Sequence, residues 1–417
     1  MPKSLYICYF GINEPLVRTQ VLPYLLEIIK DGVDVSLLTF EPNELADEER
    51  RMIGEELAAE GIAWRSRRYH KRFSVLATAY DVVTGTQAIR RWIKREKFDI
   101  LHARVHIPML MAVLASKLST TKPKLLFDIR GFFPEEYTDA GIWKRDGGLY
   151  RLVKMVERWL MKRADAFVVL TERAREILFP GSTESGCDEQ GRPIEVIPCC
   201  VDVERFAAIS QASADEMRER LGIAKRFVMA YVGSFGGWYM ADETAALFGE
   251  LKKLKENAFA LILTQSKPEI IQPLLSAVGY NPTDLWIGQV SSRDIPRYLS
   301  AADAAVSFIK PCYSKQASSP TKNAEYLACG LPIIVNDGIG DTTQQITDDH
   351  TGVVINEFKS ASYVSALAEL DDLLADRDAV RARCRVSANN RFGLVGVGGV
   401  RYRRIYRSLL DRYDLSC

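Results

Sequence analysis

The sequence is poor in several features that would place it in other classes of protein. Its formal net charge is only +1, so no global charge favours nucleic acid. Its 8 cysteines form no Cys-x-x-Cys or Cys/His metal pattern, and they are read as reduced thiols. No apolar run reaches the roughly 18 residues that span a bilayer, and the start, MPKSLYICYFG, is too soon interrupted for a secretory signal. These absences predict a cytoplasmic globular protein that meets any membrane-bound substrate at the inner membrane surface.

Short apolar segments rich in β-branched residues alternate with helical segments in both halves of the chain. The 417 residues are too many for one ordinary core, so two domains of about 200 residues are expected. The βαβα order predicts parallel sheets covered on both faces. We therefore predict two doubly wound, Rossmann-like domains that face a cleft, with ligands at the carboxyl ends of the strands. The predicted strands are Leu5–Tyr9, Val33–Phe40, Ile62–Trp64, Ile100–Ala103, Leu125–Ile129, Phe167–Leu170, Ile194–Ile197, Phe227–Val232, Ala258–Thr264, Leu285–Ile287, Ala304–Phe308, Pro332–Val335 and Val353–Ile355.

The stretch Ser318–Asn336 carries the clearest chemical signal. Its hydroxyl residues suit an N-cap and Pro320 suits a first turn, which predicts a helix over Thr321–Cys329. Lys322 and Glu325 then lie on one face. A helix N-terminus with hydroxyls and a lysine suits a diphosphate, and a carboxylate one turn further suits a ribose diol. From these residues alone, an ordinary capped helix with both charges in solvent is an equal alternative.

The order Glu-Tyr-Leu-Ala-Cys-Gly-Leu-Pro at Glu325–Pro332 resembles the donor-site signature of retaining glycosyltransferases of family 4. In that family the signature is Glu-x7-Glu, and Glu325 matches the second glutamate, which holds the ribose. The first glutamate, which touches the donor sugar, falls at Ala317 here and is absent. The SPTKxxEYxAxGxP form also resembles a sub-pattern of bacterial polysaccharide glycosyltransferases. The departure at Ala317 leaves open how the sugar is held.

The resemblance implies the GT-B fold and a division of labour along the chain. Residues 1–198 would form the acceptor-side domain and residues 199–390 the nucleotide-sugar-binding domain. The linker is expected near Pro198–Phe206, which is similar to the family linker. Residues 391–417 would form a C-terminal helix that crosses back to the first domain. A basic helix lying on a membrane is the alternative for this tail.

The implied activity is transfer of a sugar from a nucleotide diphosphate to an acceptor hydroxyl with retained configuration. The resemblance implies a metal-independent hexosyltransferase of bacterial cell-surface polysaccharide or glycoconjugate synthesis, with no cofactor. Its partners would be a sugar nucleotide and a saccharide or lipid-linked saccharide acceptor, and no nucleic acid. Two alternatives remain: a non-catalytic sugar-nucleotide-binding GT-B protein, suggested by Ala317, and a nucleotide-sugar epimerase. An epimerase needs acid and base histidines, and the chain has only 4 histidines.

The family places an arginine and a lysine after the glycine turn of the second domain, and this chain has neither. Ser234 and Tyr239 lie near those places in Tyr231–Tyr239, which is not a dinucleotide fingerprint. Charge neutralisation would then fall to lysines and arginines elsewhere, including Lys267. The predicted donor-binding residues are Gly233, Ser234, Gln265, Lys267, Gln289, Val290, Ser319, Thr321, Lys322 and Glu325.

A second informative stretch is Phe127–Glu136, FDIRGFFPEE, where many family members carry a His-Asp pair. Arg130 falls at that place and would bind an acceptor phosphate or the leaving diphosphate. For Arg130, the alternative is a structural ion pair with Asp128. For Arg18 it is an exposed position on a helix, and for His102 it is a packing role. The predicted acceptor-binding residues are Gly11, Arg18, His102, Asp128, Arg130, Glu135 and Glu136; the predicted catalytic residues are Arg130, Lys322 and Glu325.

One basic and aromatic stretch, Trp64–Phe73, predicts contact with anionic headgroups or a lipid diphosphate at a membrane surface. A solvated charged loop is the simpler alternative. Nucleic-acid binding ranks lower because no motif for it accompanies these residues.

Overall fold

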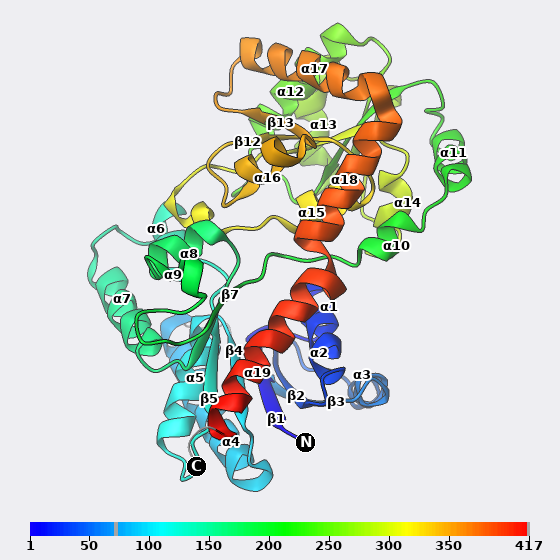
Figure 1. The fold of residues 1–417 in the computed structure, drawn as a ribbon. Helices are drawn as coiled ribbons and strands as arrows, with labels where there is room; N and C mark the ends of the chain where they lie inside the picture. The colour runs from blue at the N-terminus through cyan, green and yellow to red at the C-terminus, as the bar shows by residue number, and fades with distance from the viewer. Residues whose placement is uncertain (71–73, 415–417) are drawn as a thin grey trace. The chain divides into compact units, whose positions relative to one another are not determined.

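The computed structural model describes residues 1–70 and 74–414 of the chain. Contacts divide it into two units (Figure 1). Unit 1 comprises Met1–Pro198 and Gly398–Cys417, and unit 2 comprises Cys199–Val397. Residues 391–397, which we expected in the returning tail, therefore belong to unit 2.

Unit 1 is built on a seven-stranded parallel sheet in the order β3-β2-β1-β4-β5-β6-β7. Most of these strands are nearly continuous apolar runs, as expected for a parallel sheet covered on both faces. The strand order reverses between β1 and β4, which is the topological switch point of this sheet. The strands are β1 (Lys3–Ile7), β2 (Asp34–Glu41), β3 (Ile62–Arg68), β4 (Ile100–Arg104), β5 (Lys124–Asp128), β6 (Ala166–Val169) and β7 (Ile194–Val196).

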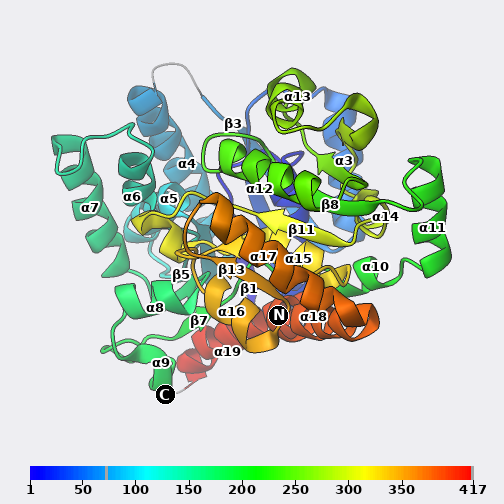
Figure 2. The ribbon, with the colours of Figure 1, turned by 90° about the horizontal axis from the view of Figure 1, so that it is seen from above.

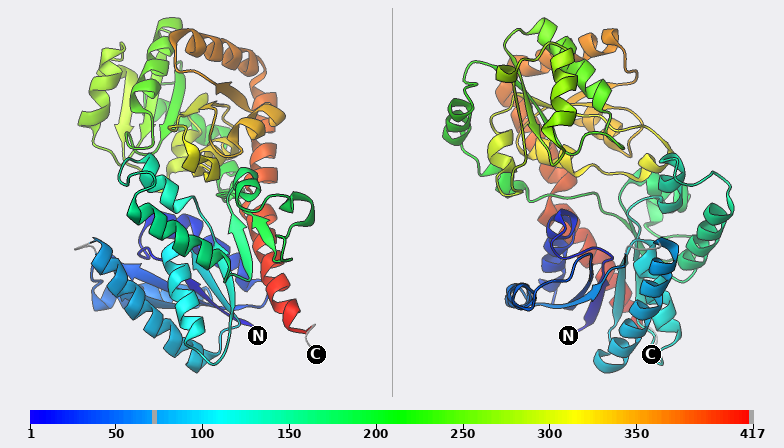
Figure 3. Two further views of the ribbon diagram at one scale, coloured as in Figure 1. Left: turned by 90° about the vertical axis from the view of Figure 1, so that its left-hand side faces the viewer. Right: turned by 180° about the vertical axis from the view of Figure 1, so that it is seen from behind.

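Helices cover the sheet of unit 1. The helices α4, α5 and α7 contact one another in series, α4 to α5 and α5 to α7 (Figure 2). The helix α19 contacts α2 and β7, and Figure 3 shows it in red beside the strands of unit 1. The helices are α1 (Pro15–Gln20), α2 (Leu22–Ile29), α3 (Asp47–Ala59), α4 (Ser74–Glu96), α5 (His106–Lys117), α6 (Phe133–Asp139), α7 (Gly148–Met161), α8 (Glu172–Leu178), α9 (Ser182–Ser185) and α19 (Val400–Asp414).

The C-terminal helix α19 is an integral part of unit 1. Four of its apolar or aromatic side chains are at most 1% exposed: Tyr402, Ile405, Tyr406 and Leu409. On its polar side, Arg403 pairs with Glu27 at 2.6 Å and Arg407 pairs with Asp31. Because its apolar side is already buried in protein, the alternative of a helix lying on a membrane is wrong for this segment.

Unit 2 is built on a six-stranded parallel sheet in the order β10-β9-β8-β11-β12-β13. Its switch point lies between β8 and β11. Along β8 the side chains alternate between two cores, with Val228 and Ala230 on one face and Met229 and Tyr231 on the other. The strands are β8 (Phe227–Val232), β9 (Ala258–Leu263), β10 (Leu285–Gly288), β11 (Ala304–Ser307), β12 (Ile333–Asn336) and β13 (Gly352–Ile355).

Short and long helices precede, connect and follow the strands of unit 2, and the last of them, a π-helical turn, runs past Val397 into unit 1. They are α10 (Val203–Ala207), α11 (Gln211–Arg220), α12 (Ala241–Leu254), α13 (Pro268–Ala277), η1 (Pro282–Asp284), α14 (Ile295–Leu299), η2 (Tyr313–Ala317), α15 (Thr321–Ala328), α16 (Thr342–Asp349), α17 (Ser360–Leu373), η3 (Leu374–Asp376), α18 (Arg377–Phe392) and the π-helical turn η4 (Leu394–Gly399).

Every strand predicted from the sequence is present, with boundaries shifted by a few residues, and the prediction of two doubly wound α/β units is confirmed. The basic stretch Trp64–Phe73 differs from the expected loop. Its first part continues β3 to Arg68 at the edge of the sheet, and Trp64 donates a hydrogen bond of 2.8 Å to Thr39. Its last three residues, 71–73, lie outside the described part of the chain.

Candidate functional site

The candidate site of unit 2 lies at the switch point of its sheet. The glycine turn that begins at Gly233 follows the carboxyl end of β8. The 3-10 helix η2 and then α15 follow the carboxyl end of the neighbouring strand β11. The Tyr326 hydroxyl of α15 accepts a hydrogen bond of 2.6 Å from the Val232 backbone nitrogen at the end of β8. This bond ties the second half of α15 to the end of β8, just before the glycine turn.

Lys322 is the unusual side chain of this site. It is only 7% exposed, and its Nζ is buried without a hydrogen-bond partner among the described residues. The Nζ lies 4.6 Å from the ring centre of Tyr231 and 4.0 Å from that of Tyr239. A β-carbon added at Gly233 would lie 3.1 Å from the same nitrogen. The two rings and the bare glycine therefore form a cage around an ammonium group that lacks an acceptor.

Burial changes the protonation of both charged residues of α15. Burial lowers the pKa of Lys322 to about 7, although the Glu325 carboxyl acts in the opposite direction. Burial also raises the pKa of Glu325 to about 7, against the lowering effects of Arg205 and Lys322. The pKa values of both groups therefore lie near neutral pH, so a change in their surroundings readily changes their charge. An anion bound at Lys322 would favour the charged ammonium.

The start of α15 differs from the predicted cap. Pro320 occupies the N-cap position itself, and its side chain gives no capping hydrogen bond. The Ser319 hydroxyl instead accepts a hydrogen bond of 3.1 Å from the backbone nitrogen of Cys199. Thr321 is the first residue of the helix, with Lys322 second and Glu325 one turn further. The predicted placement of Lys322 and Glu325 on the first turns of one helix is present.

The glycine turn is held by hydrogen bonds that leave its backbone beside Lys322. Gly233 has φ of +130°, a conformation that other residues rarely adopt. The Tyr231 hydroxyl donates to the Ser234 carbonyl at 2.6 Å, so Ser234 contributes its backbone to the turn. The Phe235 nitrogen donates to the Ser266 hydroxyl at 3.0 Å, which ties the turn to the end of β9.

The other predicted donor residues follow neighbouring strands at the same edge of the sheet. Gln265 and Lys267 follow β9 and are exposed, and Lys267 is the N-cap residue of α13. Gln289 follows β10 and is exposed, whereas Val290 is partly buried against the core. These side chains share an edge with Lys322, but no contact joins them to it.

Three features of this site were missed in the sequence. Tyr239 was noted only as the replacement of a family lysine, and its role as a ring against Lys322 was not foreseen. Lys315 of η2 lies over the Trp238 ring, with its Nζ 4.0 Å from the ring centre. Arg205 of α10 acts on the Glu325 carboxyl. Lys315 precedes Ala317 and Lys322 follows it, and this spacing could have indicated that Lys315 lies near the site. Nothing in the local sequence pointed to Arg205.

Unit 1 contains a second charged cluster, centred on Asp128 at the end of β5. Arg130 pairs with Asp128 at 2.9 Å, and the two side chains are 6% and 0% exposed. The Tyr402 hydroxyl donates to Asp128 at 3.0 Å and accepts from Arg130 at 2.5 Å. Burial alone would raise the pKa of Asp128, but Arg130 and His102 hold it below its usual value. This geometry is the structural ion pair that we weighed against a catalytic role for Arg130.

His102 is fully buried within the same cluster. Its Nδ1 lies 3.0 Å from the Tyr406 hydroxyl, and its Nε2 lies 3.4 Å from Asp128. Burial lowers the pKa of His102, which favours the neutral ring. Because neither His102 nor Asp128 exposes any side-chain surface, neither is placed to touch an acceptor directly. The contacts fit the packing role that we weighed for His102.

The remaining predicted acceptor residues lie apart from one another in contacts of their own. A β-carbon at Gly11 would lie 2.8 Å from a Glu41 carboxylate oxygen, so Gly11 allows close approach of Glu41 rather than of a phosphate. Arg18 forms an exposed ion pair with Glu56 at 3.0 Å, as its alternative reading predicted. Glu135 accepts from Lys154 at 3.0 Å and from the Tyr150 hydroxyl at 2.9 Å. Glu136 is partly buried and lies beside Gly131.

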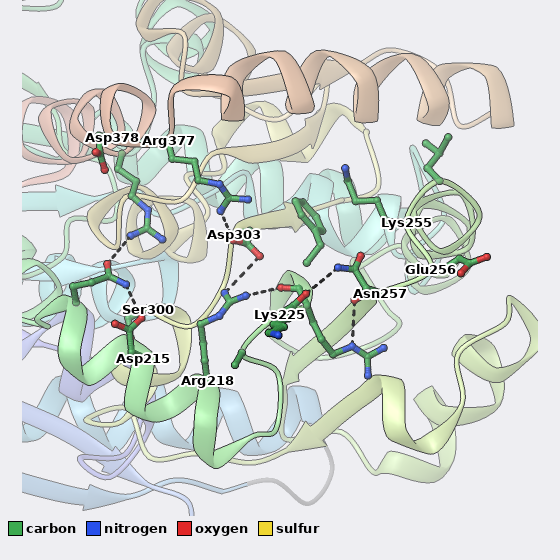
Figure 4. Close-up of a pocket in the computed structure, with 16 residues that line it drawn as sticks. Asp215, Arg218, Lys225, Lys255, Glu256, Asn257, Ser300, Asp303, Arg377 and Asp378 are labelled. Atoms are coloured by element: carbon green, nitrogen blue, oxygen red, sulfur yellow. Dashed lines mark hydrogen bonds and ion pairs between the residues drawn. The ribbon is translucent and has the colours of Figure 1, made fainter.

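A hollow of about 880 Å³ in unit 2 lies at the opposite edge of its sheet (Figure 4). It is lined by Phe227, the first residue of β8, and by Asp303, which precedes β11. Its arginines are engaged by protein groups: Arg218 donates to the Ala301 carbonyl at 2.7 Å, and Arg377 pairs with Asp303. This hollow is therefore a scaffold of internal ion pairs and not the candidate site.

Two other kinds of site are absent from the described part of the chain. No group of three or more His, Cys, Asp or Glu side chains in residues 1–70 and 74–414 is arranged to hold a metal ion. No helix in that part of the chain combines the length and the apolar character that a bilayer span requires.

Comparisons with known proteins agree with the architecture. The family model of Glycosyltransferase Family 4 matches residues 20–205, and that of Glycosyl transferases group 1 matches residues 213–391. The first match lies almost entirely in unit 1, and the second lies in unit 2. The chain belongs to the GT-B glycosyltransferases, with a family 4 domain followed by a group 1 domain.

Similar proteins extend this result. A 2-deoxystreptamine glucosyltransferase of Streptomyces kanamyceticus is 24% identical over 203 residues, which cover 47% of this chain and 49% of that protein. The match thus spans about half the length of the curated relative. A glycosyltransferase structure from Rickettsia africae superposes with a TM-score of 0.71, at 16% identity over 98% of both chains. Anabaena HepE in complex with UDP-glucose superposes with a TM-score of 0.68, at 14% identity over 99% of this chain and 100% of that one.

Proposed function

We propose that this chain is a retaining glycosyltransferase that moves a hexose from a nucleotide diphosphate to an acceptor hydroxyl. The observation that carries the proposal is the buried Lys322 nitrogen, which has no hydrogen-bond partner in the described part of the chain and lies beside Gly233 at the switch point. A diphosphate oxygen in this place would supply the missing acceptor. The N-terminus of α15 would add its partial positive charge to the same anion.

In the proposed mechanism the bond between the sugar C1 and the diphosphate oxygen breaks as the acceptor oxygen bonds to C1 on the same face. The departing diphosphate takes the proton of the acceptor hydroxyl. Lys322 stabilises the negative charge that develops on the diphosphate, and its desolvated surroundings strengthen that interaction. Neither a metal ion nor a cofactor forms part of this mechanism.

Glu325 is the proposed partner of the ribose. It lies one turn beyond Lys322 on α15, and its ionised carboxylate accepts hydrogen bonds from two vicinal hydroxyls. The complex of Anabaena HepE with UDP-glucose supports uridine nucleotides as the first donors to test. A family glutamate that touches the sugar is absent, because Ala317 stands there and is 2% exposed.

The proposed acceptor is a saccharide or a lipid-linked saccharide of bacterial cell-surface polysaccharide or glycoconjugate synthesis. The resemblance to the bacterial sub-pattern at Ser318–Pro332 supports this class, and an acceptor at the cytoplasmic membrane surface would be reached by peripheral contact. The contacts of Arg130 are internal, to Asp128 and to Tyr402 of α19. We therefore propose that Arg130 supports the acceptor side by positioning these residues and does not touch the acceptor itself.

Donor turnover with and without acceptor tests the proposal. Purified protein is incubated with UDP-glucose, UDP-galactose or GDP-mannose and with saccharide acceptors, and the products are resolved by mass spectrometry and NMR. Transfer with a retained anomeric configuration supports the proposal. Binding without transfer or hydrolysis supports the non-catalytic alternative, which the buried Ala317 favours. A changed sugar without acceptor indicates an epimerase.

A further inference from the structure

The outer side of α7 and the turn before it expose apolar side chains that no described residue covers. Ile142, Leu149, Leu152 and Met155 are each more than a third exposed. The last three recur every three residues along α7 and so form one strip. The opposite side of the helix faces unit 1, where Glu157 is buried and lies 3.1 Å from His106 of α5. We call the four exposed residues the α7 strip.

Cations border the α7 strip and are not neutralised. Arg151 and Arg158 lie four residues before and three residues after Met155 in sequence, so both are one helical turn from Met155. Six exposed basic residues in this region have no ion-pair partner among the described residues, and the exposed acid among them is Asp146. These six are Lys144, Arg145, Arg151, Arg158, Lys162 and Arg163.

The helix α4 of the same unit repeats this pattern. It exposes Leu76, Tyr80 and Val83 on one side of its first half, and this side continues through Gln87 to exposed basic residues in the second half. Both α4 and α7 contact α5, so the two exposed groups belong to one helical layer of unit 1 (Figure 2). An apolar strip bordered by unpaired cations is unlike a protein interface core, which is depleted in charge. It matches a helix that lies in the boundary between lipid headgroups and acyl chains.

We propose that this layer of unit 1 docks onto an anionic lipid surface, with the α7 strip inserted among the acyl chains and the bordering cations on the headgroups. Each basic residue near an anionic bilayer adds a favourable, salt-sensitive contribution, and the inserted apolar area adds one that salt does not screen. The proposal concerns docking alone and does not require the donor site to act as proposed above.

Vesicle flotation tests the docking. The full chain is mixed with vesicles of phosphatidylcholine alone or with roughly a third phosphatidylglycerol, a charge density at which basic clusters bind. We expect flotation with the anionic vesicles and little with the neutral ones. The paired change Leu152→Glu and Met155→Glu lowers the partition coefficient by roughly tenfold or more. Its matched control, Ile270→Glu with Val386→Glu, alters equally exposed residues of unit 2 and leaves flotation unchanged.

Two further measurements separate the possible occupants. The pair Arg151→Gln and Arg158→Gln weakens flotation and flattens its salt dependence, whereas Lys225→Gln with Arg293→Gln does not. Lys322→Met floats as the wild type does, which separates docking from donor chemistry. Absence of flotation with anionic vesicles, or equal flotation of the Leu152/Met155 pair and its control, overturns the proposal. Light scattering gives a further test of the docking proposal. If the wild type is a dimer and the paired change Leu152→Glu and Met155→Glu makes it a monomer, the proposal is also overturned.

Discussion

The two units bring charged side chains to the carboxyl ends of their strands in different ways. In unit 1, Arg130 and Asp128 form a buried ion pair and both bond to the Tyr402 hydroxyl, although Arg130 Nη1 has no hydrogen-bond partner among the described residues. In unit 2, the Lys322 nitrogen is equally buried but has neither an ion-pair nor a hydrogen-bond partner among residues 1–70 and 74–414. A buried charge that lies beside an opposite charge holds the fold together, while a buried ammonium with neither an ion-pair nor a hydrogen-bond partner is suited to a ligand. The comparison therefore assigns stability to Arg130 and anion binding to Lys322.

The largest expected effect is on catalysis by Lys322→Met. Loss of one charge that stabilises the developing anion lowers kcat by about 10²–10³-fold. The variant should melt at or above the temperature of the wild type, because the change removes a buried group that lacks a partner. Initial rates and calorimetric melting of the same preparation check this pair of outcomes. If Lys322→Met loses activity because it unfolds, the assignment of anion binding to Lys322 and of stability to Arg130 is contradicted.

Arg130→Met should show the opposite pattern. It leaves the Asp128 carboxylate buried without its main partner, which costs about 3–5 kcal/mol of unfolding free energy. Urea denaturation measures this loss. The control Arg18→Met removes an exposed pair and costs about 0–1 kcal/mol. If Arg130→Met is as stable as the control but inactive, Arg130 is catalytic and the assignment of roles in unit 1 is wrong.

Glu325→Gln should weaken donor binding by roughly 10–100-fold, because hydrogen bonds to a charged group are worth about 1.5–3 kcal/mol. Titration of UDP-glucose by calorimetry gives the affinity. Inorganic diphosphate, which has no ribose, serves as the control ligand and should bind the variant as well as it binds the wild type. Equal losses for both ligands would contradict a ribose contact.

The pH dependence of binding distinguishes the two residues of α15. At pH 8 free Lys322 is mostly neutral, because its pKa is lowered to about 7, and a bound diphosphate raises that pKa again. Binding at pH 8 should therefore take up a fraction of a proton approaching one. Glu325, with its pKa raised to about 7, is mostly ionised at pH 8 and releases a proton on ribose binding mainly at pH 7 and below. Calorimetry in buffers of different ionisation enthalpy measures both, and Lys322→Met should lose the uptake.

The smallest expected effect concerns the ring at Tyr239. Replacement by leucine keeps an apolar wall but removes a cation–π contact worth about 0.5–2 kcal/mol. Donor affinity should change by less in this variant than in Glu325→Gln. The pKa of Lys322 should fall further, because the ring no longer stabilises its charged form. The proton uptake at pH 7, where free Lys322 of the wild type is about half protonated, reports that change as an increase. An unchanged uptake would show that the ring does not interact with the ammonium.

Local sequence was sufficient where neighbours along the chain decide the structure. The alternation of apolar runs predicted both sheets, and the spacing of Lys322 and Glu325 predicted their shared helix. It was insufficient where distant segments decide. Asp128 and His102 read as strand-end residues, but Tyr402 and Tyr406 of the last helix enclose them. Gly11 read as a phosphate turn, but Glu41 at the end of the next strand occupies that space.

Thermal melting of wild type and Lys322→Met, each with and without UDP or UDP-glucose, tests the central claim most directly. A ligand at 100 times its dissociation constant adds about 2.7 kcal/mol to the free energy of unfolding. We predict that the nucleotide raises the melting temperature of the wild type and leaves that of Lys322→Met nearly unchanged, while the free variant is at least as stable as the free wild type. An equal shift for both proteins would show that the buried ammonium does not receive the diphosphate.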